Sequence, residues 1–310
     1  MLNKRPIFLN AFSRGGSNIL VNLFLSHPDV CISAGETHKV FKPGTRFDQG
    51  WMRIKKRLFY DYPIRMAIGE DYFWPNLVRP RKQVPNYVRK YIDRLLFDGR
   101  FIARIQSHNL YKSEGVKYTD EDLAKCRLLT KGLNGLVFTV DMFKEMYPDA
   151  VYFALVRNGL AVCEGRARRG HSVSKFAGHY QTIVEKMLEY SESMPNYHIV
   201  KYEDMVSKPL EFMKMLYQKA DLDINQVNKV RLESKATIDK KGNHVLNKGY
   251  DRQVFWYEPD NLQDHIKPNI NENQIKLLAP ENREIFLNIA GDSMNRLGYD
   301  TTPLVQTSTT

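Results

Sequence analysis

Cysteine is scarce in this sequence of 310 residues. Cys31, Cys126 and Cys163 are too few and too widely spaced for a disulfide framework or a CxxC metal site. Such usage is typical of a reducing compartment, so we expect a cytoplasmic protein. The eight histidines include no HExxH motif and no paired spacing with a cysteine. We therefore expect no metal site.

Long apolar runs are missing as well. A membrane-spanning helix needs about 20 consecutive apolar residues, and the stretch from Leu20 to Leu25 is far too short. A short apolar run near the start of the chain is soon followed by Arg14, and no small-residue cleavage site is present. We expect a soluble chain with neither a signal peptide nor a membrane span.

Acidic residues are fewer than basic ones, and the formal net charge is +11. A charge of this sign indicates an anionic partner: a phosphorylated small molecule, an acidic polysaccharide, a nucleic acid or a membrane surface. The basic clusters at residues 53–57 and 79–82 fit solvated faces better than binding sites. The net charge therefore predicts that the partner is anionic, and it does not identify the partner.

Strand-like and helical segments alternate along the chain, which favours a parallel central sheet flanked by helices. The predicted strands are 5–12, 30–33, 127–130, 151–156 and 198–202, and the predicted helices are 18–26, 87–97, 136–147, 175–191, 210–220 and 281–297. We predict one α/β domain over residues 1–300, with an irregular, partly helical insertion at about 41–100. Residues 234–251 are predicted to form a polar loop, and residues 301–310 a disordered tail.

A glycine-containing loop lies between the first predicted strand and the first predicted helix. Its residues are Ser13, Arg14, Gly15, Gly16, Ser17 and Asn18. Glycines let backbone N–H groups approach an anion, the helix N-terminus favours negative charge, and Arg14 adds a fixed positive charge. This pattern predicts a P-loop-like phosphate site, and the alternative is an ordinary loop capped by Ser17 or Asn18. No lysine precedes Ser17, which weakens a magnesium-dependent kinase interpretation.

The run Arg14-Gly15-Gly16-Ser17 resembles the 5′-phosphosulfate loop of the PAPS-dependent sulfotransferases, where PAPS is 3′-phosphoadenosine 5′-phosphosulfate. The resemblance is to the bacterial and carbohydrate-type branch, and further segments extend it over most of the chain. Arg157 ends an apolar strand as the family's 3′-phosphate arginine does. An arginine there can grip a phosphate bidentately.

The resemblance has one clear departure and two minor elements. The family usually has a serine eight positions after the arginine, whereas this chain has Gly165. A backbone N–H of Gly165, or the charge of Arg166, Arg168 or Arg169, are the candidate replacements. Tyr202, in a Tyr-Glu-Asp segment, is a candidate adenine contact, with a core tyrosine as the favoured interpretation. Lys248-Gly249 resembles a pair that closes on the nucleotide in some members.

The family also suggests candidates for the catalytic groups. Glu36, after the second predicted strand, resembles a strand-end glutamate that serves as the base, and His108 is its rival. Arg14 is expected to stabilise charge on the leaving oxygen and not to donate a proton. Lys131 resembles a residue near the sulfuryl group or the acceptor, and a solvated lysine is an equal alternative.

The resemblance implies a transferase that uses PAPS as cosubstrate and sulfates a hydroxyl or amine of a small-molecule or carbohydrate acceptor. It implies no metal and no nucleic-acid partner. Two other hypotheses stay open: a magnesium-dependent kinase-like P-loop enzyme, and a non-catalytic module that binds polyanions or nucleic acids. The sequence leaves the acceptor and the oligomeric state undetermined.

Overall fold

The computed structural model describes residues 5–33, 50–56, 58, 85–105, 119–234, 236–238, 244–246, 253–266 and 270–301. Its centre is a five-stranded sheet in the order β2-β3-β1-β4-β5. The strands are β1 (Ile7–Ala11), β2 (Val30–Ile32), β3 (Arg127–Leu133), β4 (Val151–Val156) and β5 (Tyr197–Lys201). All four strand pairings in it are parallel, which confirms the predicted α/β class.

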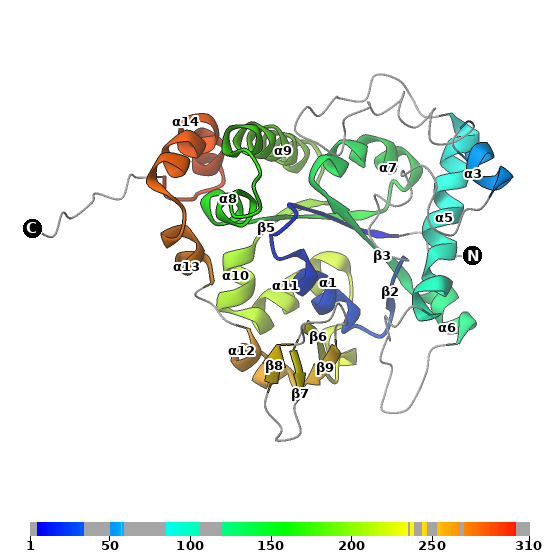
Figure 1. Ribbon diagram of the computed structural model, residues 1–310. Helices are drawn as coiled ribbons and strands as arrows, with labels where there is room; N and C mark the ends of the chain where they lie inside the picture. Colours follow the sequence, from blue (N-terminus) through cyan, green and yellow to red (C-terminus); the bar gives the residue numbers. More distant parts are fainter. Residues whose placement is uncertain are drawn as a thin grey trace, which may run out of the picture.

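Helices cover both faces of this sheet (Figure 1). They are α1 (Ser17–Leu25), α3 (Trp51–Lys56), α5 (Asn86–Ile105), α6 (Asp120–Lys125), α7 (Val140–Met146), α8 (Gly159–Ala167), α9 (Val173–Ser193), α10 (Tyr202–Ser207), α11 (Pro209–Ala220), α12 (Leu262–His265), α13 (Ile270–Lys276) and α14 (Pro280–Arg296), with the short 3-10 helices η2 (Asn134–Thr139), η3 (Ile224–Gln226) and η4 (Pro259–Asn261).

Alternate residues of β1 belong to two separate hydrophobic cores. Phe8 belongs to the core that also contains side chains of α5, α7, α9 and α14, whereas Ile7 and Leu9 belong to the core with α1 and α11 on the opposite face. Strand side chains alternate between faces, so a strand buried on both sides has to be apolar throughout. This is why the central strands were recognisable as continuous apolar runs.

Two predicted boundaries differ from the structure near the edge of the sheet where the strands end. β3 continues to Leu133, three residues beyond the prediction, so Lys131 and Gly132 belong to the strand. The predicted helix 136–147 is a 3-10 helix followed by α7. Asn134, with a φ of 52°, lies in the left-handed region where the chain leaves the strand.

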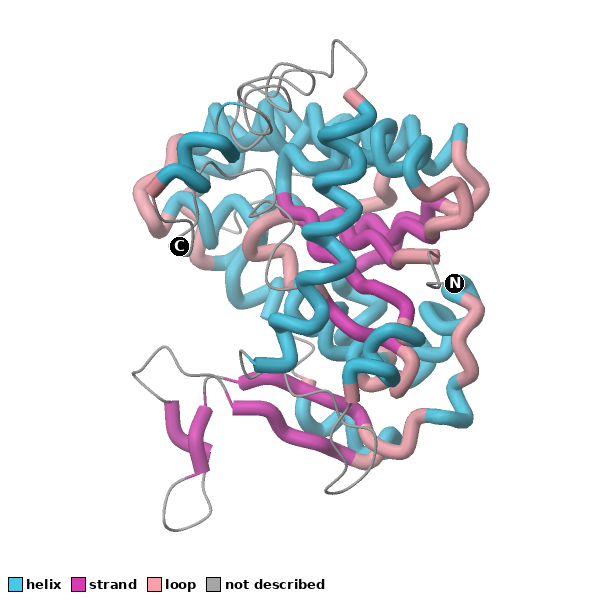
Figure 2. The backbone as a smooth tube through the Cα atoms, turned by 90° about the vertical axis from the view of Figure 1, so that its right-hand side faces the viewer, coloured by secondary structure: helices cyan, strands magenta, loops and turns pink. Residues whose placement is uncertain are grey.

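The predicted polar loop at 234–251 is wrong for the part that the structure describes. It contains β7 (Ala236–Ile238) and β8 (His244–Leu246), which pair antiparallel. A second antiparallel pair joins β6 (Val230–Ser234) to β9 (Gln253–Tyr257). Figure 2 shows both pairs at one end of the molecule, away from the central sheet. Strands of three residues are too short for hydrophobic alternation to mark them.

The predicted insertion contributes a regular element to the core. α5 extends over 20 residues, well beyond the predicted 87–97. Val88, Ile92 and Leu96, spaced four apart on one face, are fully buried against the β2 and β3 side of the sheet. The predicted disordered tail lies outside the described residues except for Thr301. Within the described part of the chain, no helix has the length and apolar character to cross a membrane.

Candidate functional site

The loop between β1 and α1 has an unusual backbone. Arg14 and Gly16 both lie in the left-handed region, with φ values of 73° and 89°. The Gly15 N–H donates to the Phe12 carbonyl at 2.9 Å, which closes a tight turn. A Cβ on Gly16 would lie 2.3 Å from the nearest ring carbon of Tyr202. Glycine is therefore required at position 16 by both its φ and its neighbour.

The N-terminus of α1 has no side-chain cap. Gly16 is the N-cap residue, and as a glycine it offers no side-chain acceptor to the first turn. The alternative in which Ser17 or Asn18 caps an ordinary loop is therefore wrong. The first N–H groups of a helix need acceptors, and together with the helix dipole they favour an anion.

Residues at the end of β3 fix this loop from the side. The Ser13 N–H donates to Asn134 Oδ1 at 3.0 Å, and Arg166 Nη2 lies 3.4 Å from the same oxygen. Lys131 Nζ donates to Asn18 Oδ1 at 2.7 Å. Lys131 therefore lies at the loop and is not a solvated surface lysine.

Arg157 follows β4 and reaches the same loop. Its side chain is 5% exposed, and its Nη1 donates to the Arg14 carbonyl at 2.8 Å. Its guanidinium carbon lies 4.4 Å from the centre of the Tyr202 ring. Burial lowers the pKa of Arg157, and Tyr202 and Glu203 oppose this shift. The two predicted anion-binding arginines therefore meet at one edge of the sheet, where parallel α/β sheets bind ligands.

Two carboxamides complete the surroundings of Arg157. Its Nε donates to Asn271 Oδ1 at 2.6 Å, and its Nη2 donates to Gln274 Oε1. Both partners come from α13. No local sequence pattern marks them as partners of Arg157, because they lie 114 and 117 residues away in the chain.

Glu203 links three separate segments behind Arg157. Its Oε1 accepts from the Asn158 N–H at 2.9 Å and from Asn271 Nδ2, and its Oε2 accepts from the Tyr299 hydroxyl at 2.8 Å. Burial first, and then the charge of Glu203, raise the pKa of Tyr299. Tyr202 was predicted as a candidate adenine contact, with a core tyrosine favoured, and no specific role was predicted for Glu203. In the structure Glu203 holds α13 and the segment after α14 in place.

Gly165 lies inside α8, close to the loop. Its backbone N–H is in the interior of the helix, where the carbonyl four residues earlier is its acceptor, so it is not free to bind a ligand. A Cβ there would lie 3.9 Å from both Arg14 Cβ and Gln274 Nε2, an ordinary contact distance. A serine would therefore fit at this position.

The three arginines after Gly165 differ in their surroundings. Arg168 pairs with Glu164 at 3.1 Å, and Arg169 is exposed. Burial, and then the charges of Arg169 and Arg14, lower the pKa of Arg166. Arg166 is the member of the cluster that contacts the loop, through Asn134.

The remaining predicted site residues lie outside the described part of the chain. These are Glu36, His108, Lys248 and Gly249. The assignment of the catalytic base therefore stays a prediction. Among the described residues, no three His, Cys, Asp or Glu side chains gather into a group that can hold a metal ion.

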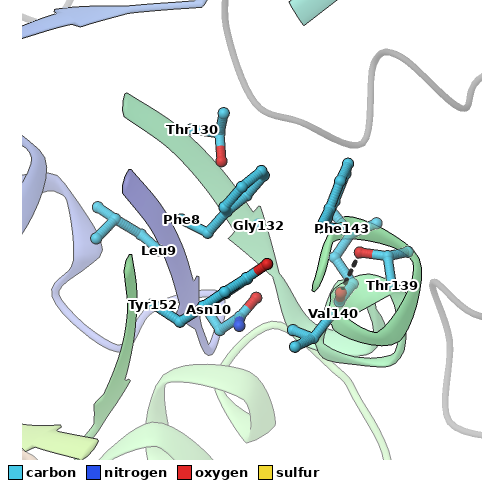
Figure 3. Close-up of a pocket in the computed structure, with 10 residues that line it drawn as sticks. Phe8, Leu9, Asn10, Thr130, Gly132, Thr139, Val140, Phe143 and Tyr152 are labelled. Carbon is cyan, nitrogen blue, oxygen red and sulfur yellow. Dashed lines mark hydrogen bonds between the residues drawn. The ribbon is translucent and has the colours of Figure 1, made fainter. Parts of the chain in front are cut away.

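A small cavity lies on the α7 side of the sheet, against β1 and β3 (Figure 3). Its lining residues are Phe8, Leu9, Asn10, Thr130, Gly132, Leu136, Thr139, Val140, Phe143 and Tyr152. The hydroxyls of Thr130 and Tyr152 are buried there, with no hydrogen-bond partner in the described part of the chain. None of residues 13–18 lines this cavity, and its buried hydroxyls make it suited to water.

Comparisons with solved structures show what the fold is similar to. The sulfotransferase domain of the olefin synthase of Synechococcus PCC 7002 is 17% identical, with a TM-score of 0.50 over 95% of this chain and 94% of that one. The sulfotransferase domain of the curacin biosynthetic pathway is 13% identical, with a TM-score of 0.48 over 95% and 98%. A sulfotransferase of Alicyclobacillus acidocaldarius is 12% identical, with a TM-score of 0.42 over 96% and 97%.

Sequence comparison is more decisive than these distant structural likenesses. No curated protein matches the chain at a significant level. A family model described as the sulfotransferase family matches residues 6–226. That span contains the β1–α1 loop, Arg157, Gly165 and Tyr202. Since it covers well over half of the sequence, the chain belongs to the sulfotransferase family.

Proposed function

We propose that this chain takes the sulfuryl group from PAPS and transfers it to a hydroxyl or amine of a small-molecule or carbohydrate acceptor. The observation that carries the proposal is the contact between Arg157 Nη1 and the Arg14 carbonyl, at 2.8 Å. It joins two arginines from separate strand ends at an uncapped helix N-terminus. Such a site suits a ligand with anionic groups at two positions.

The donor would lie with its two ends on different parts of this site. The backbone N–H groups of the loop and of the first turn of α1 would bind the 5′-phosphosulfate, together with Ser13 and Ser17. Arg157 and Arg166 would bind the 3′-phosphate. The partial burial of both arginines strengthens their attraction to a phosphate, because water screens it less.

The reaction forms a bond between the acceptor oxygen or nitrogen and sulfur. The bond from sulfur to the bridging oxygen of the donor breaks, and adenosine 3′,5′-bisphosphate leaves. Arg14 would stabilise the charge that develops on the bridging oxygen, without giving up a proton. Lys131, held at the loop by Asn18, would contact the sulfuryl oxygens.

The proton of the acceptor needs a base. Glu36 is our first choice, and His108 is the rival. A glutamate beside cationic phosphate binders can accept this proton once the substrate excludes water. We also propose a cytoplasmic location, which the three unpaired, buried cysteines support.

Thermal unfolding tests the donor class without knowledge of the acceptor. Adenosine 3′,5′-bisphosphate at about a hundred times its Kd should stabilise the protein by roughly 2.7 kcal/mol, which raises the Tm by several degrees. ADP and magnesium-ATP serve as controls. A shift with magnesium-ATP alone would contradict the proposal and favour the kinase hypothesis. Binding of generic polyanions with no response to any nucleotide would favour the non-catalytic module.

A further inference from the structure

The carboxamide of Gln274, on α13, lies near Gly165, where this chain has no side chain. Asn271 and Gln274 are three residues apart and share one face of α13. The oxygens of both carboxamides accept from Arg157, and Asn271 Nδ2 donates to Glu203. Gln274 Nε2 donates to Glu164 Oε2 at 3.3 Å. α13 is therefore fixed against the arginine that we assign to the 3′-phosphate.

The carboxamide nitrogen of Gln274 lies beside the space left by Gly165. It is 3.9 Å from the position that a Cβ of residue 165 would take, and Arg14 Cβ lies at the same distance from that position. A hydroxyl attached to that Cβ would lie in the surroundings of this nitrogen. A donor group from α13 thus lies close to the position at which the family usually has a serine from α8.

The hydrogen-bonding capacity of both residues leaves room for an anion. A guanidinium has five N–H groups, and the described contacts of Arg157 use one each for Asn271, Gln274 and Arg14. The Gln274 amide has two N–H groups, and its described contact, with Glu164, uses one. A phosphate at this point can accept from Arg157 and from Gln274 together.

We propose that Gln274 determines specificity for the 3′ end of the donor, with its carboxamide N–H in place of the hydroxyl that Gly165 lacks. This inference rests on the proposed function. A glutamine suits the role better than a glutamate, because a carboxylate would repel both the phosphate and Glu164. The proposal makes α13, which lies beyond the span matched by the family model, part of the donor site.

Calorimetric titration with two ligands tests the proposal. Adenosine 3′,5′-bisphosphate and AMP differ only in the 3′-phosphate. Gln274→Ala should weaken bisphosphate binding about tenfold, or ~1.4 kcal/mol, and leave AMP binding within twofold. Adding Gly165→Ser to that variant should recover most of the loss, since the serine fits. Asn273→Ala, an exposed amide on the same helix, is the matched control and should change neither affinity.

The outcomes separate this inference from the proposed function. Equal loss for both ligands, no loss, or tighter bisphosphate binding by Gln274→Ala would overturn the role of Gln274. Failure of Gly165→Ser to restore affinity would also overturn it, and would assign Gln274 to positioning Arg157 instead. If the unaltered protein binds the bisphosphate no better than AMP, the proposed function fails first. Unfolding midpoints of all variants without ligand show that each is folded.

Discussion

At the scale of single residues, the site depends on backbone conformations that most side chains avoid. Gly16 is the residue expected at its φ, whereas Arg14 holds a positive φ without being glycine. The left-handed conformation costs a non-glycine residue roughly 1–2 kcal/mol. Strain of this kind is retained where the side chain is needed for function, which agrees with the role we propose for Arg14.

Two substitutions of Arg14 distinguish the effect of backbone strain on stability from the effect of the guanidinium charge on ligand binding. Arg14→Gly should be more stable than Arg14→Ala by about 1 kcal/mol, because glycine tolerates a φ of 73°. Both variants should bind adenosine 3′,5′-bisphosphate more weakly than the unaltered protein, because both lack the guanidinium. Urea unfolding measures the first difference and calorimetry the second. Equal stability of the two variants would show that position 14 is not strained.

At the scale of elements, Glu203 joins parts of the chain that no short-range pattern connects. Its carboxylate receives hydrogen bonds from the start of α8, from α13 and from the segment after α14. Hydrogen bonds to a charged group contribute about 1.5–3 kcal/mol each to stability. A buried donor that loses its acceptor destabilises the protein further. The Tyr-Glu-Asp segment therefore has a structural role close to the donor site that we propose.

Removal of this carboxylate should loosen α13. Glu203→Ala is expected to lower the free energy of unfolding by about 3 kcal/mol and to weaken bisphosphate binding. Glu203→Gln should cost less than half as much, since its amide oxygen still accepts from the Asn158 N–H. Asp204→Asn, at the exposed neighbouring position, is the control. The interpretation would be wrong if urea unfolding gave the alanine and asparagine variants the same stability.

At the scale of the whole molecule, burial of titratable groups couples folding to pH. His179 is 4% exposed in α9, and its buried Nε2 has no hydrogen-bond partner among the residues that the structure describes. Burial, and then the charge of Arg166, lower its pKa to about 4 from 6.5. The folded protein therefore keeps His179 neutral in a pH range where the unfolded chain is protonated.

Acid should destabilise the protein through this histidine. The contribution of neutral His179 to the free energy of unfolding is fully present above pH 6.5. It is lost as the pH falls toward 4, because the unfolded state binds a proton that the folded state does not. The decrease in the free energy of unfolding that His179 causes is at most roughly 3 kcal/mol. His179→Gln should flatten the pH dependence of urea unfolding over this range, whereas His171→Gln, at an exposed position, should not. The same slope in both variants would contradict this account.

The sequence by itself determined the parallel sheet, the position of the loop and the place of Arg157. These follow from local patterns: apolar runs for strands buried on both faces, glycines before a helix, and an arginine where a strand ends. Because parallel strands end at the same edge of a sheet, Arg157 lies close enough to the loop for its Nη1 to donate to the Arg14 carbonyl.

Only the tertiary structure decided which groups surround those arginines. Asn271 and Gln274 are polar residues without a local signature, and they reach Arg157 and Glu203 from 68 to 117 residues away in the chain. The structure also showed that Gly165 has no free N–H and that Gln274 lies beside it. Such contacts arise from how helices pack on the sheet, and the residue types in the sequence do not encode them individually.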